Sequence, residues 1–226
     1  MDFVFMLTRD DATVPDALAL VEVARDAGVA HIGFKDVGAD AATLKGLAAA
    51  IGAAGASVWM EVVATSRDEE FRSIALGRDL GVDWLMGGTH VDEALAVLAG
   101  SATGYLPFAG RPVGHPTKLG GSADEVEAQC RAFASKGCAG ADILAYRATD
   151  AAPLDLVAAC RKGLGEGGKL VVAGSVNGPE RVAAVRAAGA DAFTVGTAAI
   201  EGAYAPGAGP LSAQLKVILA DCGRAA

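Results

Sequence analysis

The chain has 226 residues, of which 52% are hydrophobic and 20% are charged, and its formal net charge is −8. A chain this apolar with scattered charges is not disordered, and an acidic balance without a Lys/Arg-rich run argues against nucleic acid or an anionic membrane surface as a partner. No stretch approaches the roughly 20 uninterrupted apolar residues of a membrane span, and the first residues lack the basic region of a signal peptide.

The cysteine pattern and the absence of a linker indicate how the chain is organised. Cys130, Cys138, Cys160 and Cys222 lie far apart and form no C-x-x-C pair. We therefore expect free thiols in a cytoplasmic protein. Because no Ser/Pro-rich stretch interrupts the chain, we expect a single domain over residues 1–226.

One pattern recurs along the chain: a helical stretch ends at glycine and a short apolar run follows. Glycine takes the left-handed conformation that ends a helix more cheaply than any other residue. The apolar runs predict eight strands, at residues 3–7, 31–34, 57–60, 83–86, 105–107, 142–144, 169–172 and 191–195.

Helical patterns separate these strands. They cover residues 15–24, 41–53, 68–80, 91–98, 123–135, 153–164, 179–188 and 210–222. Strand–helix alternation with nearly continuous apolar strands is typical of parallel α/β proteins. Eight units of about 28 residues each predict a single (β/α)8 TIM barrel. A doubly wound open sheet is the alternative, but no G-x-G-x-x-G follows the first strand.

The turns after the seventh and eighth strands predict a phosphate site. Gly174, Ser175 and Val176 follow the seventh strand, and Gly196 and Thr197 follow the eighth. Glycines let the backbone approach an anion, and N–H groups at such turns donate to phosphate oxygens. The alternative is that these glycines only turn the chain tightly.

These two turns carry a family resemblance. The segments A-G-S-V-N-G-P-E-R-V and A-A-G-A-D-A-F-T-V-G-T-A, between residues 173 and 198, resemble the ribulose-phosphate-binding barrel superfamily. The resemblance implies carbohydrate metabolism but no single reaction, since isomerases, epimerases, aldolases, decarboxylases and synthases share the motifs. The histidine-biosynthesis isomerase is similar in length and ending. Its activity is not transferred, because the fifth strand offers no second catalytic aspartate and Asp10 is the only candidate for the first.

Three side chains at predicted strand ends are candidates for catalysis. Lys35 follows the second strand and suits an anion contact, an enolate stabiliser or a Schiff base. Glu61 follows the third strand and suits a general base. His90 follows the fourth strand and titrates in the useful range, with helix capping as its alternative role.

Further polar residues are expected to contact the substrate. The Gly/Pro-rich loop 108–121 resembles a lid and carries Arg111, His115 and Lys118. The other candidates are Asp10 after the first strand, and Tyr146 and Arg147 after the sixth. We expect Lys35, Arg111, Lys118 and Arg147 to gather where an anionic substrate lies.

Two further sites are considered. The turn at residues 86–94 resembles the seventh-strand turn and suits a second phosphate or carboxylate, although coincidence of glycine-rich turns explains it equally. No metal or other cofactor is required by the sequence. A single Mg²⁺ held by Glu61 or Asp36 is left open.

The sequence therefore favours an isomerase or epimerase that moves a proton next to the carbonyl of a phosphorylated, sugar-like metabolite. A lyase that uses Lys35 as a Schiff base or enolate stabiliser is the first alternative. A non-catalytic barrel that binds a phosphometabolite is the second. Surface helices rich in Ala and Leu are compatible with a homodimer.

Overall fold

The computed structural model describes residues 1–64, 66–114 and 116–223, and its centre is a parallel sheet of eight strands. The sheet order is β10-β11-β12-β1-β4-β5-β6-β7. The strands are β1 (Asp2–Met6), β4 (His31–Lys35), β5 (Ser57–Val62), β6 (Trp84–Gly87), β7 (Gly104–Leu106), β10 (Gly140–Ile143), β11 (Lys169–Val172) and β12 (Ala192–Val195).

The two edges of this sheet meet and close it into a barrel. The N–H of Ala139 donates to the carbonyl of Tyr105 over 3.0 Å, and the N–H of Ala109 donates to the carbonyl of Asp142 over 2.9 Å. These bonds join the edge strands β7 and β10. The predicted (β/α)8 barrel is therefore confirmed, and the open-sheet alternative is wrong.

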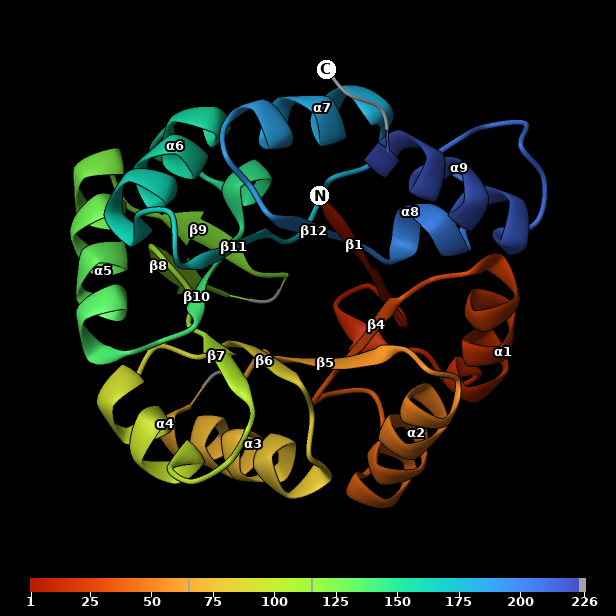
Figure 1. Ribbon diagram of the computed structural model, residues 1–226, viewed down its shortest axis with the longest axis horizontal. Coiled ribbons are helices and arrows are strands. Elements are labelled where there is room, and N and C mark those ends of the chain that lie inside the picture. Colours follow the sequence, from red (N-terminus) through yellow and green to blue (C-terminus); the bar gives the residue numbers. More distant parts are fainter. Residues whose placement is uncertain (65, 115, 224–226) are drawn as a thin grey trace.

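Helices form a ring around the strands (Figure 1). They are α1 (Ala17–Ala27), α2 (Ala41–Ala53), α3 (Arg67–Leu80), α4 (Val91–Leu98), α5 (Ala123–Lys136), α6 (Pro153–Leu164), α7 (Pro179–Ala187) and α9 (Leu211–Gly223). Gly28, Gly81 and Gly137 end their helices with φ between 66° and 84°, as the glycine pattern predicted. No helix of the described residues has the length and apolar character needed to cross a membrane.

Several short elements were not predicted. They are the hairpin of β2 (Thr8–Arg9) with β3 (Ala12–Thr13), the hairpin of β8 (Arg111–Val113) with β9 (Lys118–Gly120), the 3-10 helix η1 (Ala145–Arg147) and α8 (Thr197–Ile200). Segments of two to four residues are too short to show a hydrophobic period. All of them follow the carboxyl ends of barrel strands, where they shape the mouth.

Buried side chains fill the barrel interior. Val4, Met6, Met86, Leu106 and Val171 form an inner cluster with Trp59 and Ala192. At the amino ends of the strands, Trp59 stacks on Trp84 at 5.2 Å, and the Lys169 ammonium lies 5.1 Å from the Trp84 ring centre. This packing forms a floor at the amino ends of the strands.

Candidate active site

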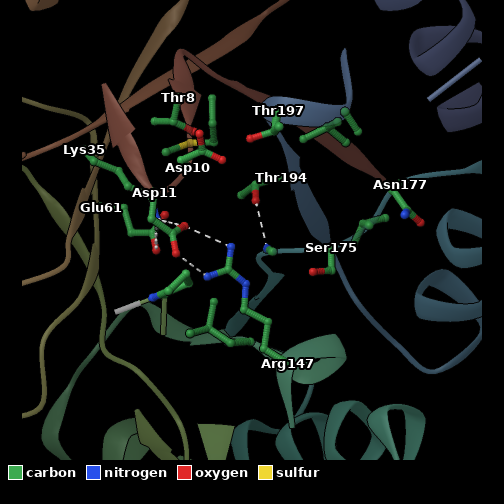
Figure 2. A pocket seen from close by; sticks show the side chains of 18 of the residues that line it. Thr8, Asp10, Asp11, Lys35, Glu61, Arg147, Ser175, Asn177, Thr194 and Thr197 are labelled. Carbon is green, nitrogen blue, oxygen red and sulfur yellow. Dashed lines mark hydrogen bonds and ion pairs between the residues drawn. The ribbon is translucent and has the colours of Figure 1, made fainter. Parts of the chain in front are cut away.

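A cavity of about 380 Å³ opens at the carboxyl ends of β1, β4, β5, β11 and β12 (Figure 2). In a barrel of this type, this is the end where active sites lie. The charged residues that line the cavity are Asp10, Asp11, Lys35, Glu61, Arg147 and Glu201. Figure 2 shows Lys35, Glu61 and Asp11 on one side and Ser175 and Asn177 on the other, with Arg147 between them.

Lys35 is the central cation of this cavity. It is the last residue of β4, lies in register with Glu61 on β5, and is only 5% exposed. Its Nζ lies 2.9 Å from Asp11 Oδ1 and 3.2 Å from Glu61 Oε1. Burial disfavours the ammonium, but the charges of Glu61 and Asp11 outweigh it and raise the pKa of Lys35 above its ordinary value. The side chain is therefore an ammonium at neutral pH.

Asp11 holds two cations in place. It is a turn residue of the β2–β3 hairpin with φ of 60°, and its carboxylate is buried. Arg147 donates to it from two nitrogens, over 2.6 Å to Oδ2 and 2.9 Å to Oδ1. Burial opposes ionisation, yet the bonds from Arg147 and the charge of Lys35 hold the pKa of Asp11 far below its usual range. Because the Asp11 carboxylate is such a weak base, it positions its neighbours and does not accept protons.

Asp142 is a second buried carboxyl group, which the sequence analysis did not select. It lies on β10 and is fully buried, and neither of its oxygens has a hydrogen-bond partner among the described residues. Burial, followed by the charge of Glu61, raises the pKa of Asp142 well above its ordinary value. Asp142 therefore keeps its proton to a higher pH than an ordinary aspartate does, while Glu61 contacts the ammonium of Lys35.

The seventh and eighth strand turns form the opposite wall of the cavity. Gly174, Ser175, Val176, Gly196 and Thr197 all line it, so the structure brings the five predicted phosphate-binding residues together. Gly174 and Ser175 both have positive φ, of 72° and 60°. A serine in the left-handed region is uncommon, and such strain is concentrated at ligand sites.

A close approach between strands explains the glycine at position 196. A Cβ atom there would lie 2.6 Å from Thr8 Oγ1 and 2.9 Å from the Thr8 carbonyl oxygen. Only glycine leaves room for β12 to end directly against the start of the β2–β3 hairpin. Thr197 and Ala198, which begin α8, then line the cavity.

Asp10 lines the cavity, as predicted, whereas His90 lies elsewhere than expected. Asp10 lines the cavity rim but is exposed, and the neighbouring Asp11 is the residue that binds Lys35 and Arg147. His90 does not line this cavity; it lies in a smaller one, where its Nδ1 is 3.0 Å from Glu70 Oε2. The structure therefore separates His90 from Lys35 and Glu61, because a carboxylate on α3 holds its ring.

The predicted cationic loop also lies apart from the cavity. Arg111 is half exposed and pairs with Glu125 and Asp150, and Lys118 is exposed on β9. Tyr146 lies under the guanidinium of Arg181, which is 4.3 Å from the ring centre. His115 falls outside the described residues. Of the loop 108–121, Pro116 alone among the described residues lines the cavity.

The mouth is consequently less basic than expected. Of the four cations predicted there, Lys35 and Arg147 line the cavity, together with four carboxylates. Asp11 lies between the two cations and neutralises part of their charge. An anionic ligand would therefore depend on neutral donors of the wall formed by Ser175, Asn177 and Thr197.

The residues considered for Mg²⁺ have other partners. Glu61 contacts Lys35, and Asp36 accepts a hydrogen bond from the N–H of Val63 over 3.0 Å. Burial raises the pKa of Asp36. Within the described part of the chain, no three His, Cys, Asp or Glu side chains are grouped so as to hold a metal ion.

Comparison with known proteins places this geometry in a structural group. No family model and no curated protein matches the sequence. Orotidine 5'-phosphate decarboxylase from Pyrococcus horikoshii matches with a TM-score of 0.65 and 15% identity, over 99% of this chain and 100% of that one. N-acetylmannosamine-6-phosphate 2-epimerase from Clostridium perfringens matches with a TM-score of 0.61 and 11% identity, over 87% of this chain and 86% of that one.

A third match extends the comparison. It is (S)-3-O-geranylgeranylglyceryl phosphate synthase from Thermoplasma acidophilum, whose structure was solved with sn-glycerol-1-phosphate. The match has a TM-score of 0.58 and 15% identity, over 98% of this chain and 92% of that one. The chain has the TIM-barrel fold that these three proteins share. At these identities the likeness defines the fold alone. The three neighbours have names that denote three different reactions, so the shared fold does not determine the chemistry.

Proposed function

We propose that this barrel is an isomerase or epimerase acting on a phosphorylated, sugar-like metabolite. One observation carries the proposal: the ammonium of Lys35, held by Asp11 and Glu61, faces a wall built from the Gly174–Ser175 and Gly196–Thr197 turns across one cavity. The wall supplies donors for a phosphate, and the opposite side supplies a cation and a base.

The proposed chemistry assigns one step to each side chain. Glu61 removes the proton from the carbon next to the substrate carbonyl, and the Lys35 ammonium donates a hydrogen bond to the carbonyl oxygen as negative charge develops there. Return of the proton to the neighbouring carbon, together with transfer of the hydroxyl proton from one enediol oxygen to the other, gives an isomer; delivery of a proton to the opposite face by a second acid gives an epimer. Asp11 and Glu61 keep Lys35 charged, and Arg147 holds Asp11 in place beside it.

A lyase is the second candidate, and the same ammonium favours one form of it. Cleavage of a C–C bond next to a carbonyl leaves an enolate, which Lys35 would stabilise as it does in proton transfer. A Schiff base requires a neutral amine, and the two carboxylates beside Lys35 oppose that state. We therefore favour an enolate-stabilising lyase over a Schiff-base lyase as the alternative.

Exchange of substrate hydrogen with solvent tests the proposal. The protein is incubated in D₂O with a panel of ketose and aldose phosphates, and deuterium at the carbon next to the carbonyl is followed by NMR. We expect incorporation with the wild type and a loss of at least about 100-fold with Glu61→Gln. Cleavage products from any of these phosphates, without deuterium incorporation, support the lyase.

Two further results separate the remaining alternatives. Borohydride treatment with substrate that leaves an adduct on Lys35 contradicts the ammonium role and supports a Schiff base. Saturable binding without exchange or cleavage, unchanged in Glu61→Gln, supports the non-catalytic binding protein. Lys35→Met is the matched control, because it is expected to abolish turnover while leaving phosphate binding on the opposite wall.

A further inference from the structure

The turn after β6 resembles the proposed phosphate turn after β11, because each contains two adjacent residues with positive φ. Gly87 and Gly88 have φ of 87° and 76°, and Gly174 and Ser175 have φ of 72° and 60°. The only other adjacent left-handed pair among the described residues, Asp10 and Asp11, forms the two-residue turn of a hairpin, where such angles are ordinary. Two barrel strands therefore end in the same uncommon turn.

The β6 turn already holds an anion, which is a side chain of the protein. The Glu70 carboxylate, from the first turn of α3, is 5% exposed. Its Oε1 accepts from the N–H groups of Thr89 and His90 over 2.8 and 2.9 Å. Its Oε2 accepts from the Thr89 hydroxyl over 3.3 Å and lies 3.0 Å from His90 Nδ1.

The turn closes tightly around this carboxylate. A Cβ atom on Gly88 would lie 2.8 Å from Glu70 Oε1, so glycine is needed for the backbone to approach it. Two backbone donors, a hydroxyl and a ring nitrogen directed at one pair of oxygens form the donor set of a phosphate or carboxylate site. A cavity of about 210 Å³, lined also by Arg67, lies beside it.

We propose that the β6–α4 turn is a second anion site, and that Glu70 occupies it and closes it to external phosphate. The inference about the substrate rests on the proposed function: the substrate carries its anionic group at the β11–β12 end only. The enzyme then takes a sugar monophosphate rather than a bisphosphate. His90 serves this closed site as a donor to Glu70, which explains its position away from Lys35.

Inorganic phosphate and the full chain test the proposal by stoichiometry. Calorimetric titration is expected to give one phosphate per wild-type chain and two per Glu70→Ala chain. The double variant Glu70→Ala with Ser175→Asp is expected to bind one. Glu70→Gln, which keeps the volume filled, and Asp155→Ala, which removes an exposed carboxylate elsewhere, are expected to behave as the wild type.

Substrate preference gives a second readout. A ketose bisphosphate is expected to bind the wild type no more tightly than the matching monophosphate. In Glu70→Ala its affinity is expected to exceed that of the monophosphate by at least about 10-fold, since the second phosphate then finds a site. Equal affinities in Glu70→Ala, with no gain in bound phosphate, overturn the proposal.

Two outcomes distinguish failure of this proposal from failure of the proposed function. If the wild type binds no phosphate but Glu70→Ala binds one, the β6 site stands and the β11–β12 site does not. If Glu70→Ala does not fold, NMR of the wild type tests whether Glu70 closes the site, through the backbone amide signals of Thr89 and His90. They are expected to stay fixed during phosphate titration, and saturable shifts of both contradict closure by Glu70.

Discussion

Asp11 and Arg147 are joined by two hydrogen bonds although 136 positions separate them in the chain. The contact ties the hairpin after β1 to the 3-10 helix after β10, across the barrel mouth (Figure 2). The same carboxylate binds Lys35. One side chain therefore orients both cations of the cavity.

Asp11→Asn is expected to destabilise the fold by about 3 kcal/mol at pH 7, because it leaves two buried or half-buried cations without their shared counter-charge. Urea unfolding measures the change. Asp10→Asn is the matched control, since Asp10 is the exposed neighbour in the same turn, and its effect is expected to stay within about 0.5 kcal/mol. Equal losses in the two variants would contradict the role given to Asp11.

Acid is expected to weaken the wild type through the same residue. The native pKa of Asp11 lies below its ordinary value of 3.8, so its stabilisation is complete above about pH 4 and is lost as the pH falls toward the native pKa. Unfolding free energies measured from pH 6 to pH 2 are expected to fall more steeply for the wild type than for Asp11→Asn. Parallel curves would show that Asp11 does not titrate in this way.

Asp142→Asn is expected to gain stability relative to the wild type as the pH rises. The native pKa of Asp142 is raised, so its favourable protonated state is retained below about pH 4, and stability is lost as the pH rises toward the native pKa. Asparagine does not ionise. The gain between pH 4 and pH 8 is expected to exceed about 1 kcal/mol, because each tenfold change in proton affinity is worth about 1.4 kcal/mol. A difference independent of pH would refute a protonated Asp142.

Gly196→Ala is expected to lower stability by about 1 to 3 kcal/mol, because its Cβ would overlap the Thr8 hydroxyl and carbonyl oxygens. Gly167→Ala provides the comparison, since a Cβ there meets no atom within 4 Å. Thermal unfolding of both variants measures the difference. If Gly167→Ala is destabilised as strongly, the close approach of β12 to Thr8 is not the cause.

Ser175→Asp is expected to abolish binding of inorganic phosphate at the β11–β12 wall, because the new carboxylate repels the anion. Ser175→Asn keeps the shape and the left-handed backbone, which asparagine tolerates, and is expected to retain binding within about 10-fold. Calorimetric titration compares the two. Phosphate bound equally by both variants would place the anion elsewhere.

Sequence periodicity was sufficient for the barrel, because glycine stops and apolar runs are local signals. Lys35 and Glu61 were predicted correctly as neighbours at adjacent strand ends, since parallel register follows from the fold. Local signals also placed the Gly174 and Gly196 turns on one cavity. Asp11 was not predicted beside Asp10, because the conformation of a two-residue turn, which the residue types do not reveal, decides which of the two side chains is buried.

Other parts of the site depend on partners distant in sequence. Nothing local to His90 reveals Glu70, which lies 20 positions earlier on a helix. Arg111 was expected at the mouth, but Glu125 and Asp150 hold it outside. Asp142 begins a predicted strand and resembles a residue of the barrel floor. Its burial beside Glu61 emerges only when β10 closes the barrel against β7.

The floor of the barrel gives the molecule a spectroscopic consequence. Its two tryptophans, Trp59 on β5 and Trp84 on β6, are paired residues of adjacent strands and stack at 5.2 Å. Indole rings this close couple electronically, so the folded chain carries an exciton signal in circular dichroism that exists only while these strands remain in register. Barrel assembly can therefore be followed optically, without a label and without any substrate.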